Sequence, residues 1–327
     1  MNKVRWGLLS TANINKMLIP AIRASERGEL TAVASRSQES ADTYAAEWGI
    51  PLTFGSYETM LASESIDAVY ISVPNHLHVE WSIRAMELGK HVLCEKPFAL
   101  NLEEMERAMA VATRTGMVLT EAFMYRHHPQ TKIAGEFLRG GRLGDISLVR
   151  GVFSFRLEDK TNVRMIPELG GGSVWDIGCY PISIAQYFMG GPPVWVFADQ
   201  DLGETGAEEI IAGQMHYSRG RIAQFTSSFR SPYYTHVDVL GTKGRLIIDS
   251  PFRIDRGHPQ LRFYPREGDP VQLQVPEKML YLGEIEDMHD AILDGAKPYL
   301  GLDETRDHIR TILAVIKSAE LHQPVRL

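Results

Sequence analysis

The hydrophobic positions of the first 120 residues follow two alternating patterns. Short runs of β-branched and other apolar residues are each followed by turn residues or by a longer stretch with helical spacing, which is typical of βαβ units around a parallel sheet. The runs predict strands at residues 4–9, 30–35, 68–73, 91–94 and 118–121, and a helix at residues 101–115. We therefore expect a doubly wound Rossmann domain over residues 1–123.

The pattern changes from Ile146 onward to an alternation with period two. Val149 and Phe153 fall on one face of the first such strand, whereas Arg150 and Ser154 fall on the other. Further strands are predicted at residues 194–198, 210–217, 221–229, 236–240, 245–249 and 261–264, and helices at residues 284–293 and from residue 303. The fold class is α/β: the Rossmann domain is followed, over residues 124–327, by an α+β domain with a large, mostly antiparallel open sheet.

Composition excludes several classes of function. With 34 basic and 41 acidic residues the net charge is −7, and no basic block is present, so we expect no nucleic-acid partner. The two cysteines, Cys94 and Cys179, are too few for a disulfide framework and leave a single disulfide open, which favours a cytoplasmic protein. No apolar run is long enough to span a membrane, so we expect no membrane association.

The turn after the first predicted strand is a candidate phosphate site. A dinucleotide-binding turn usually reads G-x-G-x-x-G, but this chain has Ser10, Thr11, Ala12, Asn13, Ile14 and then Asn15. Small residues stand at the first two glycine positions, and the backbone amides that bind phosphate belong to any residue. The place of the turn in the fold therefore predicts a phosphate site, with an ordinary strand-to-helix loop as the alternative.

The end of the second predicted strand indicates which nicotinamide cofactor is preferred. An NAD-binding unit places an acidic residue there for the ribose 2′-hydroxyl, whereas a 2′-phosphate needs an arginine and hydroxyls. This chain has Ser35, Arg36 and Ser37, with no acid. We infer NADP as the cofactor, with NAD as the alternative, and an exposed solvated arginine as the non-functional interpretation.

Two further groups of residues carry candidate chemistry. Lys96, within Cys94-Glu95-Lys96-Pro97, follows the fourth predicted strand at the carboxyl edge of the sheet, where open α/β folds bind ligands. Asp176 and Tyr180 are four residues apart and would share one face of a helix. Two observations oppose that interpretation: Ser173 and Asp176 also fit a capping pair, and Pro181 disfavours a helical conformation at Tyr180.

Together these residues resemble the Gfo/Idh/MocA oxidoreductase family. The similarity runs over nearly the whole chain and rests on Arg5-Trp6-Gly7, Pro74-Asn75-x-x-His78, Glu95-Lys96-Pro97, Glu121-Ala122 with Arg126, Gly170-Gly171-Gly172 and Asp176-x-Gly178-x-Tyr180. Many family members have histidine where this chain has Tyr180. The tyrosine form is similar to the branch of xylose and dihydrodiol dehydrogenases, which favours NADP and sugar-like substrates.

The resemblance implies an NADP-dependent oxidoreductase in which Lys96 and Tyr180 perform acid–base chemistry beside a transferred hydride. Which of the two holds the proton stays open, and Asp176 would orient the substrate hydroxyl or pair with Lys96. The cofactor contacts implied are Ser72, Val73, Pro74, Asn75, His78 and Glu95, with Arg164 and Trp175 near nicotinamide or substrate. Tyr281 is interpreted as a core tyrosine. His127 and His128 have no second ligand cluster at zinc spacing, so we expect no metal.

Two other functions stay open: a dinucleotide-binding regulator without catalysis, and an oxidoreductase that keeps its cofactor bound and moves hydride between two sugars. For assembly, the open face of the second sheet carries Ile222, Gln224, Thr226 and Ser228, and such faces commonly pair across a two-fold axis. We therefore expect a homodimer or a dimer of dimers.

Overall fold

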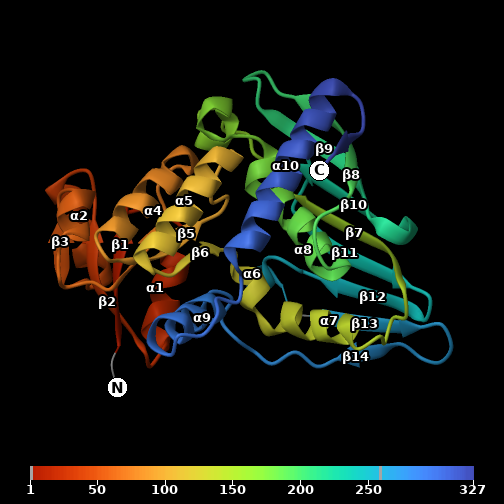
Figure 1. Cartoon of the computed structure of the whole chain (residues 1–327), viewed down its shortest axis with the longest axis horizontal. Coiled ribbons are helices and arrows are strands. Elements are labelled where there is room, and N and C mark those ends of the chain that lie inside the picture. The colour runs from red at the N-terminus through yellow and green to blue at the C-terminus, as the bar shows by residue number, and fades with distance from the viewer. Residues whose placement is uncertain (1–2, 258–259) are drawn as a thin grey trace. The chain divides into compact units, whose positions relative to one another are not determined.

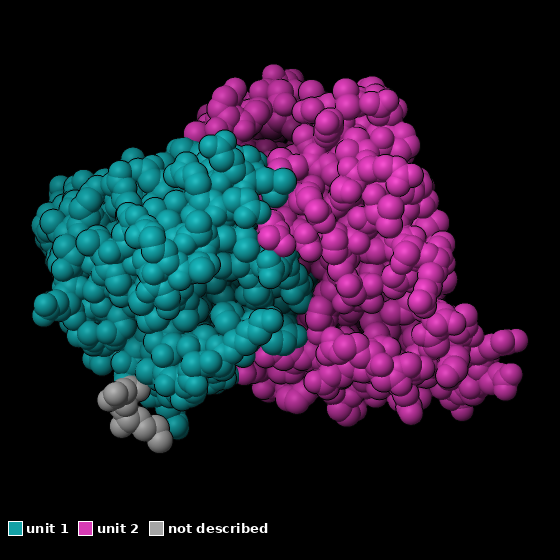
Figure 2. Space-filling model, in the orientation of Figure 1, with its two compact units in different colours: residues 1–128, 281–305 teal, residues 129–280, 306–327 magenta. Residues whose placement is uncertain are grey.

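A computed structural model describes residues 3–257 and 260–327. The chain forms two compact units, coloured separately in Figure 2. Unit 1 comprises the residues up to His128 together with Tyr281–Thr305, and unit 2 comprises Pro129–Leu280 and Arg306–Leu327. The two units are described one at a time.

Unit 1 is built on a six-stranded parallel sheet with the strand order β3-β2-β1-β4-β5-β6. The strands are β1 (Val4–Leu9), β2 (Gly28–Ala34), β3 (Leu52–Phe54), β4 (Ala68–Ile71), β5 (His91–Glu95) and β6 (Leu119–Ala122). This order places a topological switch point between β1 and β4, where Rossmann folds bind dinucleotides. The predicted doubly wound domain is confirmed; β3, with only three residues and none of them buried, was not predicted.

The helices of unit 1 begin and end at residues with ordinary capping chemistry. In α5, for example, the Asn101 side chain accepts a hydrogen bond from the backbone N–H of Glu104 at 2.8 Å, and the helix ends at Gly116 with φ of +70°. Its neighbour α4 packs beside it (Figure 1). The helical segments of unit 1 are α1 (Asn15–Ala24), α2 (Gln38–Trp48), α3 (Tyr57–Leu61), η1 (Asn75–Leu77), α4 (His78–Glu87), α5 (Leu102–Thr115), α6 (Met124–His127) and α9 (Leu282–Leu293).

Helix α9 comes from the far end of the chain and packs against α1 in Figure 1. It supplies a buried partner for the first strand: the indole Nε1–H of Trp6 donates to His289 Nε2 at 2.9 Å. Trp6 is fully buried, so its N–H needs a partner inside the unit. The core of unit 1 therefore includes residues that are distant in sequence.

Unit 2 contains a nine-stranded sheet with the order β14-β13-β12-β11-β7-β10-β9-β8-β15. The strands are β7 (Ile146–Ser154), β8 (Trp195–Leu202), β9 (Glu208–His216), β10 (Ile222–Ser228), β11 (Tyr234–Gly241), β12 (Gly244–Asp249), β13 (Gln260–Pro265), β14 (Val271–Leu273) and β15 (Val325–Arg326). Every adjacent pair is antiparallel except β7 with β10. The predicted mostly antiparallel sheet is confirmed, and the short strands β14 and β15 are additions to it.

The helices of unit 2 are α7 (Pro129–Arg139), α8 (Cys179–Met189) and most of α10 (Leu302–Leu321), with short turns η2 (Val163–Met165), η3 (Pro167–Leu169), η4 (Val174–Gly178), η5 (Ser218–Gly220) and η6 (Ile254–Arg256). Helix α8 packs directly on β7, because Gly151 leaves room for the ring of Pro181: a Cβ at Gly151 would lie 2.7 Å from Pro181 Cβ. Both cysteines are buried, and neither forms a disulfide. Among the residues described, no helix has the length and apolar character that crossing a membrane requires.

Candidate active site

The turn between β1 and α1 adopts a glycine-like conformation without glycine. Ser10 has φ of +134°, and its hydroxyl accepts a hydrogen bond from the N–H of Ala12 at 3.2 Å and lies 2.8 Å from Ser72 Oγ. The Asn15 side chain donates to the carbonyl oxygen of Ser10 at 2.8 Å and accepts from Ser72 Oγ at 2.7 Å. Three buried side chains thus hold the turn that glycines usually permit.

The same turn exposes backbone donors at the start of α1. Within the described part of the chain, the N–H groups of Asn13 and Ile14 have no protein acceptor. Unsatisfied N–H groups at a helix N-terminus form a site for an anion such as a pyrophosphate. Of the predicted cofactor residues, Ser10, Thr11, Ala12, Asn13 and Ile14 all lie in this turn.

The residues after β2 form a polar corner with no carboxylate among them. Ser35 is buried, and its N–H donates to the carbonyl of Phe54 at 3.0 Å. Arg36 is exposed, and Ser37 caps α2 by accepting from the N–H of Ser40 at 3.3 Å. The guanidinium of Arg36 is therefore available at the edge of the sheet.

His78 connects the loops after β4 and β5. Its Nδ1 lies 2.8 Å from the carbonyl oxygen of Pro97, and its Nε2 lies 2.8 Å from that of Val73. The two carbonyl partners act to raise the pKa of the His78 ring, but burial, with a smaller contribution from the nearby Lys96, lowers the pKa to about 4. We take burial to dominate, because an uncompensated charge inside the protein costs more than one poor contact. At neutral pH the ring is uncharged and donates from one nitrogen. The predicted cofactor residues in this loop are Ser72, Val73, Pro74 and Asn75. The His78 ring contacts the carbonyl oxygen of Val73 among them.

The loop after β5 carries Lys96 beside a carboxylate held on two sides. The Tyr70 hydroxyl donates to Glu95 Oε1, and the backbone N–H of Lys96 donates to Glu95 Oε2 at 3.2 Å. Next to it, Glu121 at the end of β6 accepts from the N–H of Phe98 at 2.9 Å, and burial raises the pKa of Glu121 to about 7. The neighbouring Lys96 acts in the opposite direction on that pKa. The structure therefore places the lysine at the carboxyl edge, as the sequence predicted.

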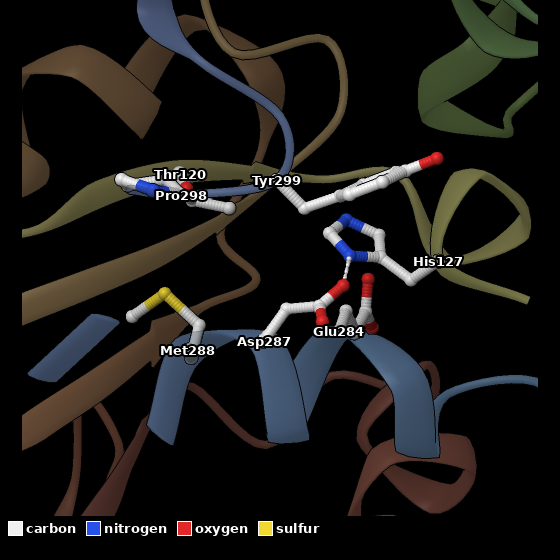
Figure 3. Close-up of a pocket in the computed structure, with 7 residues that line it drawn as sticks. All are labelled: Thr120, His127, Glu284, Asp287, Met288, Pro298 and Tyr299. Atoms are coloured by element: carbon white, nitrogen blue, oxygen red, sulfur yellow. Dashed lines mark hydrogen bonds and ion pairs between the residues drawn. The ribbon is translucent and has the colours of Figure 1, made fainter. Parts of the chain in front are cut away.

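A small pocket within unit 1, drawn in Figure 3, is lined by Thr120, His127, Glu284, Asp287, Met288, Pro298 and Tyr299. His127 Nδ1 lies 2.6 Å from Asp287 Oδ2. The carboxyl group of Glu284 is fully buried, and neither of its oxygens has a hydrogen-bond partner among the residues the structure describes. Burial raises the pKa of Glu284 well above its usual value and so favours the neutral carboxylic acid. Over residues 3–257 and 260–327, no group of three or more His, Cys, Asp and Glu is arranged to hold a metal ion.

In unit 2, Asp176 and Tyr180 lie on one continuous helical segment. The segment starts as a π-helical turn, η4, and continues as α8. Asp176 Oδ2 accepts from Arg164 Nε at 2.7 Å, which joins two predicted site residues. Tyr180 is buried and packs against Phe153, with ring centroids 5.3 Å apart. Trp175, in η4, is also buried.

Two sequence expectations about this segment need correction. Tyr180 is helical despite Pro181: both residues lie in α8, which continues without a break from the π-helical turn η4, and local π-type adjustment of a helix is one way in which a proline is accommodated. Ser173 does not cap through Asp176: its hydroxyl instead donates to Glu208 Oε1 at 2.5 Å. Glu208 was not predicted, since it lies 35 residues away in a strand with no motif around it.

The predicted site residues thus fall into two groups, one in each unit. The turn after β1, the corner after β2, the loop with His78, and Glu95 with Lys96 all belong to unit 1, at the carboxyl ends of its strands. Arg164, Trp175, Asp176 and Tyr180 belong to unit 2.

Family models match both parts of the chain. Residues 4–123 match an oxidoreductase family with an NAD-binding Rossmann fold (GFO/IDH/MocA), and residues 132–247 match the GFO/IDH/MocA C-terminal domain. A curated relative, D-xylose 1-dehydrogenase (NADP(+)) 2 from Haloferax volcanii, is 38% identical over 98% of this chain and 99% of its own length.

Solved structures agree over the full length. Aldose-aldose oxidoreductase from Caulobacter crescentus, complexed with glycerol, is 26% identical, has a TM-score of 0.93 and is matched over 100% of both chains. A 3-ketoreductase from Actinomadura kijaniata, in complex with NADP and TDP-benzene, is 29% identical with a TM-score of 0.89 and covers 97% of this chain and 98% of its own.

Proposed function

Because the chain belongs to the GFO/IDH/MocA family of oxidoreductases, we propose that it is an NADP-dependent oxidoreductase that transfers a hydride between nicotinamide and a sugar-like alcohol or carbonyl. The observation that carries the proposal is the position of Lys96, at the carboxyl edge of a sheet with the order β3-β2-β1-β4-β5-β6. That edge is where such sheets bind dinucleotides.

The residues of unit 1 fit NADP. The N–H groups of Asn13 and Ile14 at the start of α1 would hold the pyrophosphate. Arg36, flanked by Ser35 and Ser37, would hold the 2′-phosphate, since an arginine matches a phosphate in charge and geometry and the corner lacks the carboxylate that NAD calls for. The loop fixed by His78 would lie along the nicotinamide half.

The cofactor, when bound, supplies or accepts the hydride, and the chain must move one proton. In the oxidation direction, a base on the protein would take the proton of the substrate hydroxyl while the hydride of the carbinol carbon is transferred. Tyr180 is the candidate base, and Lys96 would stabilise the developing charge on the substrate oxygen and favour the phenolate. Asp176, held by Arg164 at 2.7 Å, would orient the substrate hydroxyl.

The names of similar proteins support a sugar substrate. One relative is a D-xylose dehydrogenase that uses NADP, and one solved neighbour is an aldose-aldose oxidoreductase. The second likeness favours one further candidate, in which the cofactor stays bound and hydride moves between two sugars. In that case the purified protein should carry NADP(H) and should convert pairs of aldoses without added cofactor.

The test is the absorbance of reduced nicotinamide after the purified protein is mixed with NADP or NAD and one substrate from a panel. The panel contains aldoses, of which D-xylose is tried first, together with inositols and trans-dihydrodiols. Lys96→Met and Tyr180→Phe should each lower turnover by about two orders of magnitude while sparing NADPH binding. The exposed Lys243→Met and Tyr234→Phe are matched controls and should keep normal turnover. Near-normal turnover in both site variants would overturn the catalytic assignment.

We also propose a homodimer or a dimer of dimers formed through the face of the unit 2 sheet that bears Gln224 and Thr226. Gln224 is exposed on a central strand, β10. A monomeric mass by light scattering would contradict this assembly.

A further inference from the structure

A buried carboxyl group from β9 contacts the start of the helical segment that carries Asp176 and Tyr180. The Ser173 hydroxyl donates to Glu208 Oε1 at 2.5 Å, and the backbone N–H of Val174 donates to Glu208 Oε2 at 2.8 Å. The Ser173 hydroxyl also lies 2.8 Å from Ser227 Oγ on β10. All of these contacts lie within unit 2.

These contacts satisfy a donor that the helix itself cannot satisfy. The first N–H groups of a helix have no partner within it, and an oxygen acceptor at that end both fixes the helix start and suits its positive dipole. Here the acceptor comes from a neighbouring strand, since Ser173 is itself helical and makes no capping bond. The carboxyl group therefore ties the helix start to the sheet.

Close packing leaves the segment little freedom to shift. Gly172, just before the segment, has φ of +111°, which side chains rarely adopt, and a Cβ there would be in ordinary contact with Glu208 Oε2 at 3.4 Å. At the other end of η4, a Cβ at Gly178 would lie 2.7 Å from Ser227 Oγ. The π-helical turn between them has a wider winding than an α-helix, which is a common feature of functional sites, and it sets the positions of Asp176 and Tyr180.

We propose that Glu208 is a positioning residue for hydride transfer: through Ser173 and Val174 its carboxyl group fixes the π-helical turn and thereby places Asp176 and Tyr180. Only the catalytic part of this inference rests on the proposed function. The positional part concerns the geometry of unit 2 and holds whether or not the protein turns over a sugar.

The neighbouring Glu209 offers a matched control. Its carboxylate is bound by Lys160 at 2.7 Å and Arg230 at 2.6 Å, and those bonds lower the pKa of Glu209. Burial instead raises the pKa of Glu208 to about 7. The two adjacent glutamates therefore differ in partners: one contacts the site segment, and the other forms ion pairs.

The experiment combines hydrogen exchange with kinetics on the full chain. Glu208→Ala should speed amide exchange in residues 172–180 by about tenfold, since a lost capping acceptor is worth about that factor. It should also lower kcat roughly 10- to 100-fold and leave the Kd for NADPH unchanged. Glu208→Gln should restore most of the slow amide exchange and most of kcat, because an amide can still accept from the N–H of Val174 and contact Ser173.

Glu209→Ala is expected to change neither the exchange of residues 172–180 nor kcat. If Glu208→Ala does not fold, Ser173→Ala removes one of the two contacts and should give a change of about threefold in the same direction. Unchanged exchange in Glu208→Ala, or an equal change in Glu209→Ala, would overturn the proposal. Altered exchange in a protein with no turnover on any substrate of the panel would instead support the positional role and count against the proposed function.

Discussion

Substitutions at Ser10 test how the turn after β1, the candidate phosphate site, is stabilised. At φ of +134° a residue with a Cβ is strained, and glycine is the residue that usually stands there. The Ser10 hydroxyl compensates through its contacts with the N–H of Ala12 and with Ser72. Replacing Ser10 with glycine and, separately, with alanine separates the strain from the hydrogen bonds, because both variants lose the hydroxyl and only glycine relieves the strain.

The size of each effect predicts the order of the two variants. The strain costs about 1–3 kcal/mol, and the hydrogen bonds contribute about 0.5–1.5 kcal/mol each. The glycine variant also loses about 0.5–1 kcal/mol of stability, because glycine gives the unfolded chain more conformational freedom. We therefore expect Ser10→Gly to be near the native stability and Ser10→Ala to be about 0.5–2 kcal/mol less stable than the glycine variant.

The assay is urea unfolding followed by tryptophan fluorescence, with NADPH binding measured on the folded variants. Ser25 provides the control, because it is also a buried serine with a bound hydroxyl, 3.1 Å from His289 Nδ1, but its φ is −81°. At Ser25 the alanine variant should be at least as stable as the glycine variant. If alanine is also the more stable at Ser10, the idea that this turn stores backbone strain is wrong.

Two further predictions concern buried groups near the site. Burial raises the pKa of Glu121 from 4.5 to about 7. The native chain should therefore lose about 3 kcal/mol of stability as the pH rises from about 4.5 to 7 and above. Glu121→Gln should remove most of that loss, and an unchanged pH dependence of urea unfolding in this variant would contradict the prediction. Gly151→Ala brings a methyl group to 2.7 Å from Pro181 Cβ, so it should cost about 1–3 kcal/mol and lower kcat by displacing Tyr180. Gly301→Ala, with nothing within 4 Å of its Cβ, should do neither.

The sequence was informative wherever the relevant signal is local. The strand from Val4 to Leu9 and the helix at residues 101–115 were predicted from the hydrophobic pattern, and both are confirmed, the helix as Leu102–Thr115. The position of Lys96 followed from the parallel strand before it. The family resemblance added a hypothesis that spacing alone does not contain, namely that Lys96 and Tyr180 perform acid–base chemistry together.

Features that depend on contacts between distant segments could not be predicted. The turn after β1 is held by Ser72, which lies 62 residues beyond Ser10. Glu208 has no motif around it, and its role depends on a bond to Ser173. The partners of His78 are likewise set by the fold, because both of its ring nitrogens face carbonyl oxygens of neighbouring loops. Burial and partner choice at these positions follow from the three-dimensional fold.

The return of Tyr281–Thr305 to unit 1 has a consequence for how the protein is made. Trp6, near the start of the chain, finds the partner for its indole N–H only at His289, 283 residues later. On the ribosome, where synthesis proceeds at about 5–20 residues per second, the finished β1 strand must wait on the order of ten seconds or more for α9. The cofactor-binding unit is therefore completed only after residues 129–280 of unit 2 have been synthesised, although its β1 strand is made before them.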